Sequence, residues 1–398
     1  MDLIIRPGRI IDGTGGPIAE GREVVVTDGR IGQLGPAGSA VAGPDTVVID
    51  ASTATLMPGL IDLHMHLFHW KQRPDVPWQN ESILEIGCRG IRNASTLLDM
   101  GVTTARDLTA RDNLSIQLRD LINAGTVRGP RLLASGTHLE AEGRAGYVLQ
   151  GISVNGPDEV RAATRRQLRA GADWIKIMAT AGVGGGSGKL ISEPGWQELT
   201  EDEIRAAAVE AHAPGRKITA HAIGTAGIKA AIRAGVDCIE HGSFLDDEAI
   251  ELMVEHNVAL VPTLMAGVEL ADHGEENGFL PNIVERAKRC VDAGLKGTHE
   301  AHRAGVVIGS GSDVQVNETV AQEVRMLIEA GLSPMEALLA ATSVAAGILD
   351  LGAELGSIEA DKVADLILLD GDPLADPYAL ERVSHVIHNG VLVKSPAA

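Results

Sequence analysis

The sequence predicts an α/β protein: a (β/α)8 TIM barrel with a small β-sandwich domain built from both termini. Two observations point to this fold class. The middle of the chain alternates short apolar segments with longer segments rich in Ala, Glu and Arg, whereas both ends hold short apolar runs between Gly, Pro and Asp turns. Strands that alternate with helices form βαβ units and a parallel sheet. We therefore expect a β-sandwich domain over residues 1–57 and 360–398 and a barrel over residues 58–359.

The barrel strands are predicted from apolar segments in the middle of the chain. Helices are expected between them, for example at Pro157–Ala170, Asp202–His212 and Ala226–Ala234. Eight such units favour a closed barrel, and a doubly wound open sheet is the alternative. The predicted strands are Gly59–His64, Val102–Asp107, Arg131–Ser135, Trp174–Met178, Ile218–His221, Cys238–His241, Val258–Pro262 and Val306–Gly309.

The two ends of the chain share one pattern. Asn389-Gly390 lies between apolar residues of Val386–Val393, and Asn-Gly in such a place is typical of a β-hairpin. Similar short runs suggest that the two ends form one β module; they are Leu3–Ile5, Glu23–Thr27, Thr46–Ile49 and Asp365–Leu369.

Composition narrows the choice of partner. The formal net charge of -20 would repel a polyanion, so we expect no nucleic-acid partner. No apolar run reaches the roughly 18 residues of a membrane span, and the N-terminal residues resemble a strand rather than a secretion signal. Three cysteines without paired spacing argue against a disulfide framework; they are Cys88, Cys238 and Cys290. We expect a cytoplasmic protein that acts on a small molecule.

Two histidines close the first predicted barrel strand. His64 and His66 are two residues apart, so in a strand both imidazoles point to the same face. Such a pair at the end of an inward-facing strand suits a divalent metal ion. A His-x-His pair alone is a weak signal, because core histidines are common.

Lys176 lies in the fourth predicted strand. Alternation places Ile175 and Ile177 on one face and Lys176 on the other, toward the barrel interior. A buried ammonium is costly unless it is paired, neutralised or modified. A salt-bridged core lysine is the alternative interpretation.

Three more candidates end later strands. His221 ends the fifth strand, His241 ends the sixth, and Asp313 follows the eighth. Barrel chemistry is assembled at the carboxyl ends of strands. Singly, the histidines could be core residues and Asp313 a helix N-cap. Together, six candidate ligands at one level of a barrel favour a metal site.

This constellation resembles the amidohydrolase superfamily over nearly the whole chain. Pro58–His66, Ile239–Gly242 and Ala364–Pro373 are similar to its segments on strand 1, on strand 6 and at the return to the β-sandwich. The Gly-Ser-Asp before Val314 also matches. Gly171–Met178 is similar to the imidazolonepropionase-like and Xaa-Pro dipeptidase-like branch.

The resemblance implies a binuclear metal centre with a carboxylated lysine. Lys176 would carry CO2 on its side-chain nitrogen and bridge both ions. His64, His66 and Asp313 would hold the first ion, and His221 and His241 the second. Histidine-rich ligation favours Zn²⁺, with manganese, cobalt and iron open. Analogy with the family suggests a homo-oligomer.

Two positions depart from the dipeptidase pattern. Ile223 stands where a tyrosine commonly follows the strand-5 histidine and its alanine, and Ala145 stands where a Gly-Gly-His-Gly segment has histidine. Both bear on substrate binding. The departures favour a more apolar amide, carbamate, lactam or ester over a plain dipeptide.

The implied reaction is cleavage of a C–N bond by a metal-bridging hydroxide, with Asp313 as general base. His138 is the candidate oxyanion donor, and His69 and Tyr147 are weaker candidates for substrate binding. The loops after strands 4 and 7, including Gly182–Lys189 and His273, would cover the site.

Three alternatives stay open. A lactonase or esterase would use the same binuclear site. A mononuclear deaminase or cyclic-amidine hydrolase would do without a bridging lysine, so Lys176 argues against it. A non-catalytic scaffold would have lost ligands, and all six are present.

Overall fold

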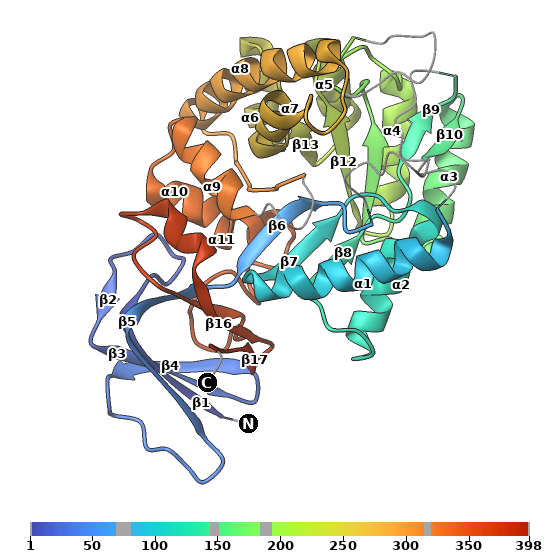
Figure 1. The fold of residues 1–398 in the computed structure, drawn as a ribbon. Helices are drawn as coiled ribbons and strands as arrows, with labels where there is room; N and C mark the ends of the chain where they lie inside the picture. The colour runs from blue at the N-terminus through green and yellow to red at the C-terminus, as the bar shows by residue number, and fades with distance from the viewer. Residues whose placement is uncertain (1, 69–80, 144–150, 184–192, 314–319, 397–398) are drawn as a thin grey trace.

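The computed structural model describes residues 2–68, 81–143, 151–183, 193–313 and 320–396. Both ends of the chain contribute to one eight-stranded sheet, hereafter the terminal sheet, in the lower part of Figure 1. Its order is β17-β16-β15-β5-β1-β3-β4, with β2 paired to β1. The strands are β1 (Leu3–Ile10), β2 (Ala19–Glu20), β3 (Arg22–Thr27), β4 (Arg30–Pro36), β5 (Val47–Pro58), β15 (Leu366–Leu369), β16 (Val383–His388) and β17 (Val391–Lys394).

The central strand β5 joins the two ends of the chain. It pairs in parallel with β1 and antiparallel with β15. Alternate residues of these strands, including Leu3, Ile5, Leu56 and Leu366, share one buried apolar cluster. The terminal sheet is therefore held by burial as well as by its backbone ladder.

The middle of the chain forms two parallel sheets. The first has the order β6-β7-β8 and the second the order β10-β9-β11-β12-β13-β14. The short strands β9 and β10 are additional to the predicted ones. The bounds are β6 (Leu60–Met65), β7 (Val102–Asp107), β8 (Arg131–Ala134), β9 (Leu139–Ala141), β10 (Ile152–Val154), β11 (Trp174–Met178), β12 (Lys217–Ala222), β13 (Cys238–His241) and β14 (Ala259–Val261).

A few backbone hydrogen bonds connect the two parallel sheets. The Asp173 amide donates to Ala134 at the end of β8. On the other side, residues 307–310 lie between β14 and β6, where Gly309 N donates to Leu260 O and Leu63 N to Ser310 O. The predicted eighth strand is present only as an isolated parallel bridge between Leu260 and Ile308.

Glycine lets this segment approach β6 closely. A Cβ atom on Gly309 would lie 2.3 Å from a methyl carbon of Leu63, and one on Gly311 would lie 2.8 Å from Cβ of His64. Side chains at these positions would push the segment away from β6. The segment carries Asp313, so the glycines help set the position of that carboxylate.

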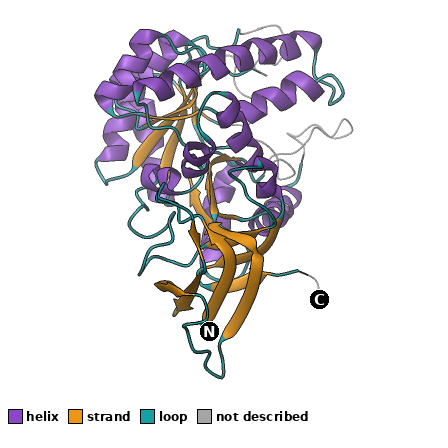
Figure 2. Cartoon of the chain, turned by 90° about the vertical axis from the view of Figure 1, so that its left-hand side faces the viewer, coloured by secondary structure: helices purple, strands orange, loops and turns teal. Residues whose placement is uncertain are grey.

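Helices cover the outside of the parallel strands, and they gather in the part of the molecule away from the terminal sheet (Figure 2). Ser82, Thr200 and Ser333 each begin a helix with a capping box. The predicted helix at Pro157–Ala170 has the same bounds in the structure. The helices are α1 (Ile83–Asp99), α2 (Leu114–Asn123), α3 (Pro157–Ala170), α4 (Glu201–His212), α5 (Thr225–Ala234), α6 (Asp247–His256), α7 (Leu264–His273), α8 (Pro281–Ala304), α9 (Val320–Glu329), α10 (Pro334–Ala340) and α11 (Ser343–Ile348), with short 3-10 turns at Arg111–Asn113 and Pro377–Glu381.

The region after strand 7 differs from the prediction of a loop. His273 is the last residue of α7, a helix that follows β14 almost directly. The segment Leu264–His273 is rich in helix-forming Leu, Ala, Met and Glu, which explains the helix. Of the predicted loop Gly182–Lys189, residues 184–189 lie outside the described ranges. None of the described helices is long and apolar enough to traverse a lipid bilayer.

Candidate metal centre

A small buried cavity lies where the carboxyl ends of the parallel strands meet. Its volume is about 30 Å³, which is enough for a water molecule. All six predicted metal ligands and His138 line it. The full lining is His64, His66, Thr109, His138, Lys176, Met178, His221, His241 and Asp313.

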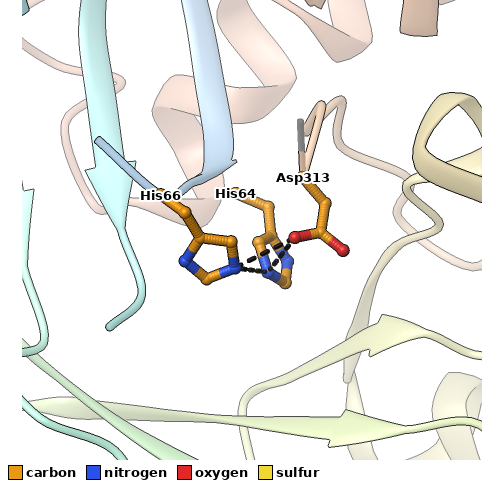
Figure 3. A group of neighbouring side chains, drawn as sticks. All are labelled: His64, His66 and Asp313. Atoms are coloured by element: carbon orange, nitrogen blue, oxygen red, sulfur yellow. Dashed lines mark hydrogen bonds and ion pairs between the residues drawn. The ribbon is translucent and has the colours of Figure 1, made fainter. Parts of the chain in front are cut away.

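His64, His66 and Asp313 form the tightest group in this cavity. The Asp313 Oδ1 atom lies 2.9 Å from His66 Nε2 and 3.4 Å from His64 Nε2, and the two Nε2 atoms are 3.2 Å apart. Figure 3 shows the three side chains pointing toward one another: His64 comes from β6, His66 follows the end of β6, and Asp313 comes from the segment beside it. Their ligand atoms all lie within 4.8 Å of one another, so one ion could contact all three.

Lys176 enters the cavity from β11. Its side chain is buried, and its Nζ atom has no hydrogen-bond partner among the described residues. Burial lowers the pKa of Lys176 to about 8, with Arg106 adding to the shift, although Glu240 and Asp313 oppose it. A neutral amine is therefore accessible near neutral pH. A buried amine without a partner is what a lysine would show if a further group occupied the space beside it.

His221 and His241 end adjacent strands, β12 and β13. Their ring centroids are 4.4 Å apart, and the His241 ring lies 5.2 Å from that of His64. Burial lowers the pKa of His66 and of His221 to about 3 and lowers the pKa of His64 and of His241 well below the usual range. Neutral imidazoles present a lone pair, which metal binding requires.

Glu240 fixes the orientation of His64. This fully buried carboxylate on β13 accepts from His64 Nδ1 at 2.7 Å, from Arg106 Nη2 at 2.7 Å and from the Thr219 hydroxyl. If Nδ1 carries the proton, Nε2 is left with its lone pair toward the cavity. Neither Glu240 nor Arg106 was predicted from the sequence to have a role in the site. Two charged residues inside apolar strand segments were the signal that could have identified them.

Asp62 holds the two ligand-bearing segments together. Its carboxylate accepts from the His64 backbone amide and from the amide and hydroxyl of Ser312. The Asp313 amide in turn donates to His64 O at 2.7 Å. Burial raises the pKa of the Asp62 carboxyl to about 7, against these hydrogen bonds. Asp313 has a positive φ of 50°, so this backbone is held in a strained conformation.

His138 lies at the cavity edge just before β9. Its Nδ1 atom is 2.7 Å from the Thr109 hydroxyl and its Nε2 atom 3.2 Å from Glu140 Oε2. Gly151 makes room for this arrangement, because a Cβ atom there would lie 2.5 Å from His138 Nε2. Both ring nitrogens thus have partners, and the ring still faces the cavity.

Of the four residues predicted to bind substrate, only Ile223 lies within the described part of the chain. Ile223 is buried and does not line the cavity; its amide donates to the Thr180 hydroxyl and its carbonyl accepts from Phe244. His69, Ala145 and Tyr147 lie outside the described residues. The geometry therefore locates the candidate ligands but gives no substrate contact for these four positions.

Comparison with known proteins identifies close relatives of this architecture. A family model described as the amidohydrolase family matches residues 55–393. Ochratoxinase of Aspergillus niger is 31% identical over 434 residues, covering 99% of this chain and 87% of that enzyme. A crystal structure of a Xaa-Pro dipeptidase with bound methionine is 31% identical with a TM-score of 0.89, and the match covers 99% of this chain and all of that one.

A more distant relative lies in the other predicted group. The imidazolonepropionase of Symbiobacterium thermophilum is 24% identical over 418 residues, covering 92% of this chain and 90% of that enzyme. Together with the dipeptidase, it confirms the resemblance drawn from the sequence. The matches also imply a TIM-barrel-like α/β fold.

Proposed function

We propose, from the premise that this chain belongs to the amidohydrolase family, that it is a binuclear metal-dependent enzyme. Its membership and its relatives make it a hydrolase that acts on C–N bonds. One observation carries the metal proposal: side chains from β6, β11, β12, β13 and the segment before α9 meet in one small cavity. We also propose that the parallel strands close into a (β/α)8 barrel, with residues 1–57 and 360–398 as a separate β module.

The donor set fits a pair of divalent ions. His64, His66 and Asp313 would hold one ion, and His221 and His241 the other. Lys176, carboxylated on Nζ, would be a ligand of both ions; its buried amine has no hydrogen-bond partner among the described residues, which supports this assignment. Nitrogen-rich ligation favours Zn²⁺. When bound, such ions supply Lewis acidity that lowers the pKa of water and polarises a carbonyl group.

The chain's own residues would move the proton and hold the substrate. Asp313 is the proposed general base, because its carboxylate reaches into the cavity beside His64 and His66. Burial raises the pKa of its carboxyl, although His64 and Lys176 oppose the rise. A raised pKa helps a carboxylate to keep a proton long enough to deliver it to the leaving nitrogen.

His138 is the proposed hydrogen-bond donor to the substrate carbonyl oxygen. Its contact with Glu140 is the longer of its two, so a substrate oxygen would replace that one while Thr109 keeps the ring in place. A donor fixed before the reaction stabilises the developing negative charge without reorganisation.

The substrate we propose is a peptide-like or N-acyl amide. A Xaa-Pro dipeptidase and an ochratoxinase are each 31% identical to this chain. Ile223 in place of a tyrosine, and Ala145 in place of a histidine, remove polar side chains and so favour a more apolar substrate than a plain dipeptide; Ile223 itself does not line the cavity.

The test is an activity screen of metal-reconstituted protein against N-acyl amino acids, dipeptides, carbamates and lactones. We expect hydrolysis of amide substrates that chelation removes and divalent metal restores. Asp313→Asn serves as the inactive comparison. Turnover of lactones or esters alone would contradict C–N bond cleavage, and turnover indifferent to chelation would contradict the metal centre.

A further inference from the structure

The helix that follows β14 begins in an unusual way. An N-cap residue normally accepts a hydrogen bond from the first helical amides through its own side chain. Thr263 precedes α7 as its N-cap, yet its hydroxyl makes no such bond. Instead, Thr263 Oγ1 lies 2.7 Å from Nδ1 of His241. The capping hydroxyl is therefore committed to a candidate metal ligand.

Glu323 supplies the missing cap from another helix. Its Oε1 atom accepts from Leu264 N at 3.0 Å and its Oε2 atom from Met265 N at 2.8 Å. Glu323 lies on α9 and is fully buried. A carboxylate at a helix N-terminus satisfies the free amides and also lies favourably in the helix dipole. The Glu323 carboxylate therefore caps the first amides of α7 in place of the Thr263 hydroxyl.

The backbone of Thr263 shows that this arrangement is enforced. Its φ is 48°, in the left-handed region that β-branched residues rarely adopt. Such a conformation persists only where the surroundings over-determine it. The amides next to it are fixed by Glu323, and its hydroxyl is fixed by His241.

The hydroxyl has a defined effect on His241. If His241 Nδ1 donates its proton to Thr263 Oγ1, then Nε2 carries the lone pair. The same hydrogen bond limits rotation of the ring, whose centroid lies 4.4 Å from that of His221 and 5.2 Å from that of His64. Partners behind metal-binding histidines determine which nitrogen is available and how the ring is aimed.

We propose that Glu323 is a positioning residue for the metal centre, which acts by capping α7 so that the Thr263 hydroxyl is free to orient His241. This inference rests on the proposed function, because it takes His241 as a metal ligand. It extends that function to a residue outside the cavity lining and on a separate helix.

The experiment is a titration of metal-free protein with Co²⁺, followed by visible absorption and by bound metal per chain. Thr263→Val removes the hydroxyl at nearly constant shape, and Thr263→Ser keeps it. Glu323→Gln keeps the shape but replaces one acceptor oxygen by a donor. Glu336→Gln is the matched control, because Glu336 completes the capping box of α10 and does not line the cavity.

We expect Thr263→Val and Glu323→Gln each to lower the affinity for the second Co²⁺ ion by about 10- to 100-fold. The affinity for the first Co²⁺ ion should not change. Thr263→Ser and Glu336→Gln should bind both Co²⁺ ions with nearly the affinities of the unaltered protein. The double variant Thr263→Val/Glu323→Gln should be no weaker than the weaker single variant, because both changes act on one route to His241.

Two further results separate the possible failures. If His241→Ala leaves both equivalents bound, the proposed function fails at that ligand. If His241→Ala removes the second equivalent but Glu323→Gln or Thr263→Val keeps it, the positioning role is overturned. Should Glu323→Gln lower the melting temperature of the metal-free protein, the Thr263→Val and Thr263→Ser pair decides, since α9 is untouched there.

Discussion

Two buried charged residues, one in the terminal sheet and one in the cavity, are treated in opposite ways. Glu23 on β3 accepts hydrogen bonds from Arg6, from the Ser39 hydroxyl and from the amides of Gly38 and Ala40. Lys176 on β11 is buried without any such partner among the described residues. Burial removes water from both side chains, but only Glu23 has hydrogen bonds that replace the lost contacts with water.

The pKa values follow from this difference. Burial opposes ionisation of Glu23, but its hydrogen bonds with Ala40, Arg6, Gly38 and Ser39 outweigh it and lower the carboxyl pKa to about 2. Burial of Lys176 lowers the amine pKa to about 8. The hydrogen bonds of Glu23 keep its carboxylate charged and stabilise the fold. The buried amine of Lys176 lacks such hydrogen bonds, so its pKa lies closer to neutral pH and the amine can react.

Backbone strain divides the same way. Near the cavity, His241, Thr263 and Asp313 all have a positive φ although none is glycine. Around the terminal sheet, the non-glycine residues with a positive φ are Asp28, Asp361 and Asn389, residue types that tolerate this conformation in turns. Thr263 differs from all of these because it is β-branched, so its surroundings must impose the conformation.

Loss of the proposed general base in the cavity should have the largest effect on activity. Asp313→Asn keeps the side-chain shape but cannot accept the proton. We expect kcat to fall by about 10²- to 10⁴-fold. Steady-state kinetics with the best amide substrate measures it, and Asp292→Asn on the exposed face of α8 is the control. A fall of less than tenfold would remove Asp313 from the proton transfer.

His138→Ala should have the next largest effect. It removes the proposed donor to the carbonyl oxygen, so we expect kcat to fall by about 10²- to 10³-fold. Metal content should not change, because His138 is not a proposed ligand. A variant that lost metal together with activity would instead make His138 part of the metal centre.

Glu240→Gln tests the support behind His64. The amide keeps one acceptor oxygen but no longer balances the charge of Arg106, which is fully buried. We expect metal binding to weaken by about 10- to 100-fold and stability to fall by about 3 kcal/mol. Equilibrium unfolding and metal titration measure the two effects. Glu251→Gln, on the exposed side of α6, should change neither.

Glu23→Gln should leave catalysis unchanged and affect stability alone. Donors around position 23 would lose a charged acceptor, at a cost of about 1–3 kcal/mol. The folded carboxyl has a pKa of about 2, below its usual value of 4.5, so its contribution is present above pH 4.5 and is lost as the pH falls toward 2. Melting temperatures should therefore fall less steeply over that window in the variant.

The comparison for this variant is Glu20→Gln, at an exposed position of β2. It should match the unaltered protein at every pH. A change in kcat in Glu23→Gln would contradict the view that Glu23 contributes to stability alone.

Strong periodicity made most of the parallel strands predictable. Val102–Asp107 and Trp174–Met178 have the predicted bounds, and the face of Lys176 followed from simple alternation. The short strands β9 and β10 were missed, because three residues carry no readable period. Residues 306–309 form a bridge rather than a full strand, since glycines bring the chain close to β6 without a continuous ladder.

The meeting of the candidate ligands in one cavity was predictable, because each lies in, at the end of or just after a predicted strand. The residues that hydrogen-bond to these ligands or to the segments that carry them were not predictable. Glu240, Arg106 and Glu323 act across elements far apart in the chain, and their contacts depend on register and helix packing that no local pattern contains. A buried charge in an apolar segment indicates that a partner exists but does not identify it.

We propose that Lys176 and the five other candidate ligands in the cavity hold two metal ions. The most direct measurement is a crystal structure of metal-loaded protein with data collected at the absorption edge of the metal. The expected result is two anomalous peaks in the cavity, one about 2 Å from His64, His66 and Asp313 and the other about 2 Å from His221 and His241, with added density on Lys176 Nζ between them. A single peak, or an unmodified Lys176 remote from both ions, would contradict it.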